Sequence, residues 1–173
     1  MKFALQHNSY GKSSVKLAKV SRHGNKHEIQ ELCVDIVLEG SFEESYTDGD
    51  NSFVVATDSM RNTVYVLAAE NKFDSPEEFG KLLANHFLTS YAQVKMATID
   101  ISQTIWQRID VDGKPHGHAF VGGSNEKRRA RIHKEGTTLT VDSGIEGLAV
   151  LKTTNSGFEG FVRDRYTTLP ETA

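Results

Sequence analysis

The feature that most constrains this 173-residue sequence is a hydrophobic period that changes twice along the chain. In residues 31–38 every second residue is apolar, the period of a β-strand with one buried face. From Asp58 the apolar residues recur three or four positions apart, as on an amphipathic helix, and beyond Tyr91 the strand period returns. This order predicts an α+β fold in which two strands, two helices and two further strands form one ββααββ unit.

The first two strands are predicted from a hairpin signature. A short run at 14–21 is followed by the turn residues Gly24 and Asn25, and the alternating segment then returns. Gly40 interrupts that segment, and residues 41–47 are expected to extend the strand as far as the turn-forming stretch at 48–51.

Two helices are predicted between the strand pairs. The first covers about 58–69, where the apolar stripe consists of Met60, Val64, Leu67 and Ala68. The second covers about 76–90, because Ser75 suits the N-cap, Pro76 the first helical position and Glu78 the capping box. Thr57 and Asp58 stand where strand turns into helix, and on residue type alone they are expected to cap it.

The later strands are predicted at 94–109 and 115–121, joined by a turn at 110–113. Residues 122–125 (Gly-Gly-Ser-Asn) are expected to break the chain, after which 127–134 and 137–141 form another hairpin around Gly136. The predicted organisation is therefore a first unit at 1–123 and the opening strands of a second, truncated unit at 124–173.

Charge and hydropathy exclude several kinds of partner. The formal net charge is −3, so neither nucleic acid nor anionic lipid is expected to attract the chain. No segment approaches the about 20 apolar residues of a membrane span, and Met1–Asn8 lacks the apolar run of a signal peptide. The single cysteine, Cys33, has no partner for an intramolecular disulfide, so we expect a reducing, cytosolic compartment.

Common catalytic and metal-binding motifs are absent from the sequence. It contains no Walker loop, no G-x-G-x-x-G after a strand, no H-E-x-x-H and no C-x-x-C. His116 and His118 share a strand face without a third ligand, which favours a structural pair and predicts no metal. The basic run at 127–131 is expected to be a solvated face or an oligomer contact. On residue type alone, Lys12 is expected to be solvated and Phe158 to lie in the core.

Several segments, taken together in order and spacing, resemble the uricases (urate oxidases). The resemblance covers nearly the whole chain. It is carried by Tyr10-Gly11-Lys12, by residues 46–52 and 54–65, and by later stretches at 106–109, 116–120, 151–158 and 163–172.

The resemblance implies both a fold and a reaction. The fold is the tunnelling fold (T-fold), in which tandem ββααββ units with two helices on one face of an antiparallel sheet assemble around a central tunnel as a homotetramer. The reaction is the oxidation of urate by O2 to 5-hydroxyisourate and hydrogen peroxide in purine degradation, with no metal or organic cofactor.

The resemblance also assigns roles to four residues. Lys12 matches the family's catalytic lysine, and Thr57 matches its partner in a proton relay and a substrate contact. Asp58 matches a further substrate contact, and Phe158 matches the ring that stacks on the purine. The active sites lie between subunits, where Thr57 and Asp58 face the lysine of a neighbour, so a monomer is expected to be inactive.

One departure from the family pattern shapes the functional expectation. The family's urate-gripping arginine, and the valine-glutamine, asparagine and relay histidine beyond it, are not in this sequence. We therefore expect the amino-terminal part of a bacterial-type uricase, completed by further sequence or by a separate chain.

Two alternatives compete with that expectation. One is a non-catalytic T-fold fragment that assembles or binds a purine without turnover. The other is a related pterin or purine enzyme, which is disfavoured because such families use other motifs. The expected compartment is the bacterial cytoplasm, or the peroxisome in a eukaryote.

Overall fold

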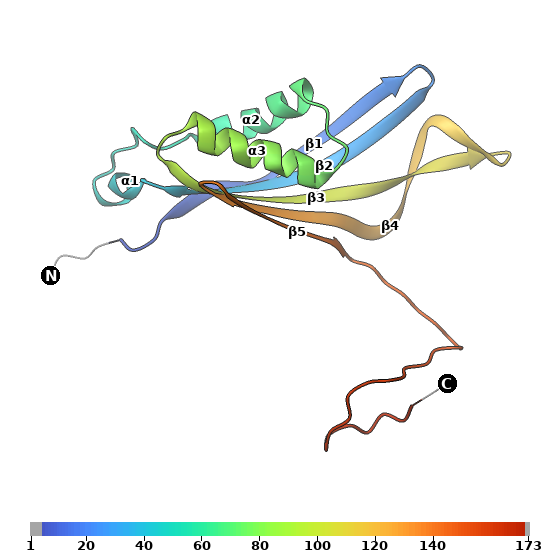
Figure 1. Ribbon diagram of the computed structural model, residues 1–173. Coiled ribbons are helices and arrows are strands. Elements are labelled where there is room, and N and C mark those ends of the chain that lie inside the picture. Colours follow the sequence, from blue (N-terminus) through green and yellow to red (C-terminus); the bar gives the residue numbers. More distant parts are fainter. Residues whose placement is uncertain (1–4, 172–173) are drawn as a thin grey trace.

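A five-stranded antiparallel sheet with two long helices on one face forms the body of the protein. The computed structural model describes residues 5–171, so Thr172 at the end of the last uricase-like stretch lies outside the described residues. Figure 1 shows α2 and α3 lying together across the same side of the sheet. In chain order the elements are β1 Ser9–His23, β2 Lys26–Gly40, α1 Glu43–Thr47, α2 Thr57–Glu70, α3 Pro76–Ser90, β3 Val94–Val111, β4 Lys114–Glu135 and β5 Thr138–Glu146.

The sheet follows chain order from β1 to β5, with every neighbouring pair antiparallel. This arrangement confirms the predicted ββααββ order, with β5 added at one edge. The outer edges of β1 and β5 pair with no other strand in the described part of the chain.

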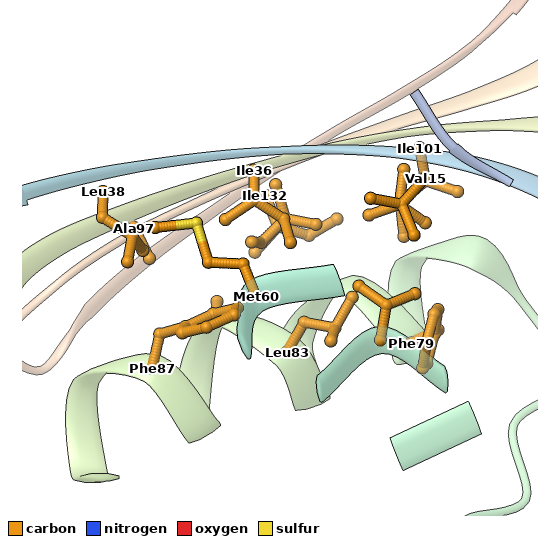
Figure 2. Packing of buried hydrophobic residues seen from close by; sticks show 14 of the residues in the cluster. Val15, Ile36, Leu38, Met60, Phe79, Leu83, Phe87, Ala97, Ile101 and Ile132 are labelled. Carbon is orange, nitrogen blue, oxygen red and sulfur yellow. The ribbon is translucent and has the colours of Figure 1, made fainter. Parts of the chain in front are cut away.

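The core lies between the sheet and the two helices. The alternation predicted in β2 is confirmed, since Leu32, Val34, Ile36 and Leu38 are each at most 2% exposed. Figure 2 shows Ile36, Ile101 and Ile132 from the sheet meeting Met60, Leu83 and Phe87 from the helices. Full burial of a side chain of this size stabilises the fold by about 1.5–3 kcal/mol.

Helix α3 begins as its sequence predicts. The N–H of Glu78 donates to Ser75 Oγ at 3.2 Å, and Glu78 Oε2 accepts the N–H of Asp74 at 2.8 Å. Gly80 lets this helix approach β4, because a Cβ there would lie 2.2 Å from Cδ1 of Ile132.

Helix α2 begins one residue earlier than predicted and without a side-chain cap. Its N-cap is Ala56, in extended conformation (φ −57°, ψ 135°), so Thr57 is already the first helical residue. The prediction that Thr57 or Asp58 caps the helix is therefore wrong.

Residues 41–47 do not extend the second strand, contrary to the sequence prediction. The chain leaves the sheet after Gly40 and forms the short helix α1. Phe42 is 1% exposed and packs edge-on against Tyr10, with ring centroids 4.8 Å apart and planes at 89°. Burial of Phe42 against a distant residue thus overrides the local alternation of the segment.

The predicted break at 122–125 is also wrong, since these residues lie inside β4. Their position instead coincides with a shift of register. Trp106 pairs with Gly122 and Thr104 with Lys127, so residues 123–126 lie opposite Ile105 alone. The glycine-rich composition marks a large bulge rather than the end of a strand.

Between residues 147 and 171 the chain forms no long helix or strand. Figure 1 shows this segment leading away from the sheet. The division into two units at 123/124 stays a prediction, and that boundary would fall within β4. None of the helices within residues 5–171 has the length and hydropathy needed to cross a membrane.

Candidate active site

Lys12 lies on β1 immediately before a β-bulge. The register steps from Lys12 opposite Ile36 to Val15 opposite Val34, so Ser13 and Ser14 together face Asp35. Lys12 is half-buried. Its neighbour Gly11 approaches β2 so closely that a Cβ there would lie 1.8 Å from the carbonyl oxygen of Ile36. The Tyr10-Gly11-Lys12 motif therefore has a structural requirement at its middle position.

Tyr10 connects the start of β1 to the segment that enters α2. The N–H of Val55 donates to Tyr10 Oη at 2.7 Å, and that hydroxyl donates to the carbonyl oxygen of Val55 at 3.2 Å. Burial raises the pKa of the Tyr10 hydroxyl, with the Val55 hydrogen bond as a smaller opposing effect. The hydroxyl therefore stays protonated at neutral pH and can serve as donor and acceptor at once.

This link brings the elements that carry Lys12 and Thr57 together within one chain. Lys12 lies two residues beyond Tyr10, and Thr57 lies two residues beyond Val55. Two further bonds hold the surrounding loop, since Tyr46 Oη donates to the carbonyl of Ser9 at 3.0 Å and Gln93 Nε2 to that of Phe53 at 2.8 Å.

Tyr10 supports the site but was not among the site residues predicted from the sequence. The available signal was its position, since a residue two places from a strand lysine shares its face. The partner of Tyr10 lies 45 residues away in sequence, and no local pattern identifies it.

Thr57 and Asp58 form the exposed first turn of α2. The carboxylate of Asp58 forms an ion pair with Arg61 and accepts a hydrogen bond from Asn62 Nδ2 at 3.1 Å. The first N–H groups of a helix have no acceptor within it, and the positive end of the helix dipole lies there. This turn can offer donors to a carbonyl-bearing or anionic ligand.

Phe158 lies apart from the other predicted site residues, in the segment that leads away from the sheet (Figure 1). The prediction that it is a core residue is wrong, because it is 58% exposed. Its ring stacks on Phe161 with centroids 4.9 Å apart and planes within 9°. The structure thus assembles the Lys12 and Thr57 region but does not bring Phe158 to it.

The basic run at 127–131 forms ion pairs rather than a cluster of unpaired cations. Arg128 pairs with Glu77 at 3.4 Å, Arg129 with Glu146 at 3.4 Å and Arg131 with Asp100 at 3.8 Å. These arginine side chains are 43–61% exposed, which agrees with the predicted solvated face.

His116 and His118, both on β4, contact each other. The rings of His116 and His118 lie 4.5 Å apart, edge to face, and the N–H of His118 donates to His116 Nδ1 at 3.2 Å. Over residues 5–171 no three His, Cys, Asp or Glu side chains gather in a way that could hold a metal ion.

Two surface hollows of about 270 Å³ each lie away from the predicted site. One lies between β1 and α2, lined in part by Leu17 and Tyr65, and the other lies against α2 and α3 beside Asn62 and His86. Neither is lined by Lys12, Thr57, Asp58 or Phe158.

The antiparallel sheet with its helices on one face, an arrangement shared with solved uricase structures, defines a protein of the tunnelling-fold class. A sequence model of the family described as uricase matches residues 8–133 and 141–173. The chain belongs to the uricase family.

Curated relatives and solved structures agree with this assignment. The chain is 45% identical over 166 residues to a uricase from Aspergillus flavus, covering 94% of this chain and 55% of that one. It is 47% identical over 167 residues to a uricase from Arabidopsis thaliana, covering 94% and 54%. The crystal structure of uricase from Arthrobacter globiformis superimposes with a TM-score of 0.82 at 44% identity, covering 99% of this chain and 58% of that one.

The chain spans about half the length of the curated relatives that it matches.

Proposed function

We propose that this chain supplies the amino-terminal part of a urate oxidase, with a first T-fold unit at 1–123 and the opening strands of a second at 124–173. The observation that carries this proposal is the pair of hydrogen bonds between Tyr10 and Val55, which supports Lys12 and Thr57 acting together. Because both bonds lie within one chain, the relay proposed here joins Lys12 and Thr57 of the same subunit, which differs from the neighbouring-subunit arrangement that the family resemblance implies.

The proposed reaction is a two-electron oxidation of the purine. Urate, O2 and water give 5-hydroxyisourate and hydrogen peroxide, so urate is oxidised at the carbon that gains the hydroxyl and O2 is reduced. Urate must lose a proton to become electron-rich enough to react with O2. The Lys12 amine acts as the base, and the Thr57 hydroxyl passes the proton and later returns one. This chemistry uses no cofactor.

Substrate binding is assigned to the start of α2 and to an aromatic ring. The N–H groups of Thr57 and Asp58 donate to an acceptor on the purine. The ring of Phe158 stacks on the purine plane, a contact of about 0.5–1.5 kcal/mol beyond burial. Figure 1 shows Phe158's segment leading away from the body that carries Lys12, which supports a site completed between subunits.

The proposed partners follow from this arrangement. They are urate, O2 and other subunits of a homotetramer, together with the remaining half of the protein, in the same or a separate polypeptide. Nucleic acid and membranes are not proposed partners. For the compartment we propose the cytoplasm in a bacterium or the peroxisome in a eukaryote, from the family resemblance alone.

The test is to follow the ultraviolet absorbance of urate together with O2 uptake, using the chain alone and the full-length protein. We expect both signals to fall with the full-length protein and not with its Lys12→Met variant. Methionine removes the base without opening a core cavity, so folding should persist in circular dichroism. Urate binding without consumption in the full-length protein would instead support a non-catalytic, purine-binding T-fold protein.

A further inference from the structure

The direction in which Lys12 points does not follow from the alternation of β1. Val15 is 2% exposed and faces the helices, and with a regular period of two Lys12 would face the opposite, uncovered side of the sheet. Residues directly opposite each other in an antiparallel pair share a face, and Lys12 lies opposite Ile36. Ile36 belongs to the core beneath the helices (Figure 2).

The bulge at Ser13 and Ser14 is therefore what brings Lys12 to the helix-covered side. It inserts one extra residue between Lys12 and Val15 relative to β2, which reverses the phase of the strand. The same reversal puts Tyr10 on the helix side, where its hydroxyl meets Val55. Without the bulge, both Tyr10 and Lys12 would turn away from the segment that leads to Thr57.

A side chain of β2 forms a hydrogen bond to the backbone of this bulge. Ser14 has φ of 58°, a left-handed conformation that is unfavourable for a residue other than glycine. Its N–H donates to Oδ1 of Asp35 on β2 at 2.6 Å. A hydrogen bond to an ionised carboxylate is stronger than one between neutral groups, so it offsets the unfavourable conformation.

The position of Asp35 is otherwise unfavourable for the sheet. Asp35 lies directly opposite Asp100 on β3, and like charges in such a pair destabilise a sheet. Asp100 has its own partner in Arg131 on β4. The hydrogen bond from the N–H of Ser14 therefore explains the presence of a carboxylate at position 35.

We propose that Asp35 is a positioning residue for Lys12. It holds the bulge that keeps Lys12 and Tyr10 on the side of the sheet where Thr57 is anchored. Asp35 acts through Ser14 and touches no substrate. The inference deepens the proposed function and rests on it where catalysis is concerned, but the placement of Lys12 can be measured separately.

The structural test compares Asp35→Ala and Asp35→Asn with Asp100→Ala as the matched control. We expect amide hydrogen exchange at Ser14 to quicken about tenfold or more in Asp35→Ala and less in Asp35→Asn, which keeps an oxygen acceptor. Acylation of the Lys12 amine, followed by mass spectrometry, should rise in the same order. Asp100→Ala should leave both measurements at wild-type values.

Two outcomes would overturn the inference. One is Ser14 exchange and Lys12 acylation in Asp35→Ala that match wild type. The other is an equal change in Asp100→Ala. If Asp35→Ala does not fold, Asp35→Leu decides, because it also removes the acceptor and wild-type values at both positions in it would overturn the inference. Ser14→Gly added to Asp35→Ala should restore Lys12 placement, since glycine accepts the left-handed conformation without the bond.

The catalytic test uses the full-length protein. Asp35→Ala should lower kcat for urate oxidation about tenfold or more while KM stays within about twofold, and Asp35→Asn should recover much of kcat. A rise in KM at unchanged kcat would contradict positioning of the base. Unimpaired urate turnover by Lys12→Met would instead contradict the proposed function. Amide exchange at Ser14 and acylation of Lys12 would still show whether Asp35 positions Lys12.

Discussion

The sheet-and-helix body at 9–146 and the segment at 147–171 differ in how they treat apolar side chains. In the body, Phe79, Leu83 and Phe87 are fully buried between sheet and helices. In the segment, Leu151 is 89% exposed and Val162 is 91% exposed. The body therefore buries its large apolar side chains within itself. The segment instead exposes apolar surface of the kind that another protein surface covers. The proposed site divides in the same way, with Lys12 and Thr57 in the body and Phe158 in the segment.

The largest expected effect tests the proton relay that is assigned to the body, through Thr57. Thr57→Ala in the full-length protein should lower kcat for urate oxidation by about 10²-fold or more, because it removes the relay hydroxyl. The side chain is exposed and makes no cap, so unfolding should be unaffected. Thr57→Ser, which keeps the hydroxyl, is the control. Equal activity of the alanine and serine variants would exclude a relay through this position.

A matched pair of leucine substitutions tests the packing contrast directly. Leu83→Ala should lower the free energy of unfolding by about 2–5 kcal/mol, because it leaves a cavity between α3 and the sheet. Leu151→Ala should change it by no more than about 0.5 kcal/mol. Urea denaturation followed by circular dichroism measures both in this chain. Comparable losses for the two variants would mean that the segment packs on the body.

Phe158→Ala tests the share of the site assigned to the segment. In the full-length protein KM for urate should rise about two- to tenfold with little change in kcat, since stacking contributes about 0.5–1.5 kcal/mol. Phe158→Tyr keeps the aromatic face and should behave as wild type. An unchanged KM in the alanine variant would argue against stacking.

The smallest expected effect concerns alkaline pH and the Tyr10 link. Because burial raises the pKa of Tyr10, the folded protein holds this proton at a pH where the unfolded chain has lost it. The stabilisation is complete below about pH 10, the usual pKa of tyrosine, and is lost as pH rises through the folded pKa. Urea denaturation between pH 9 and pH 11 should show this decline in wild type. A decline of the same size in Tyr10→Phe would assign it to other groups.

The hydrophobic periods predicted most of the helices and strands, because each element buries one face in the core between the sheet and the helices. Apolar and polar residues alternate from Leu32 to Leu38 because one face of the sheet is covered by helices. The start of α3 is predictable because Ser75 and Glu78 form its capping box. The failures came where distant contacts outweigh local pattern. Residues 41–47 alternate like a strand, yet Phe42 is buried against Tyr10, more than 30 residues away in sequence.

The candidate site was predictable as a set of residues but not as an arrangement. Family resemblance identified Lys12 and Thr57, and the Tyr10–Val55 bonds that join their elements span 45 residues. The direction of Lys12 could not be read from alternation, because counting back from Val15 gives the wrong face of the sheet. Only the register between β1 and β2 reveals the bulge that reverses it.

The open edges of β1 and β5 have a consequence for how copies of this chain meet. Each edge presents a row of backbone donors and acceptors that another strand can extend, whatever its side chains are. Backbone pairing of this kind is strong but indiscriminate, so the choice of partner must come from the side chains that flank it. On β1 those include Lys12 and Lys16, whose shared positive charge discourages two β1 edges from meeting each other and favours an edge flanked by carboxylates.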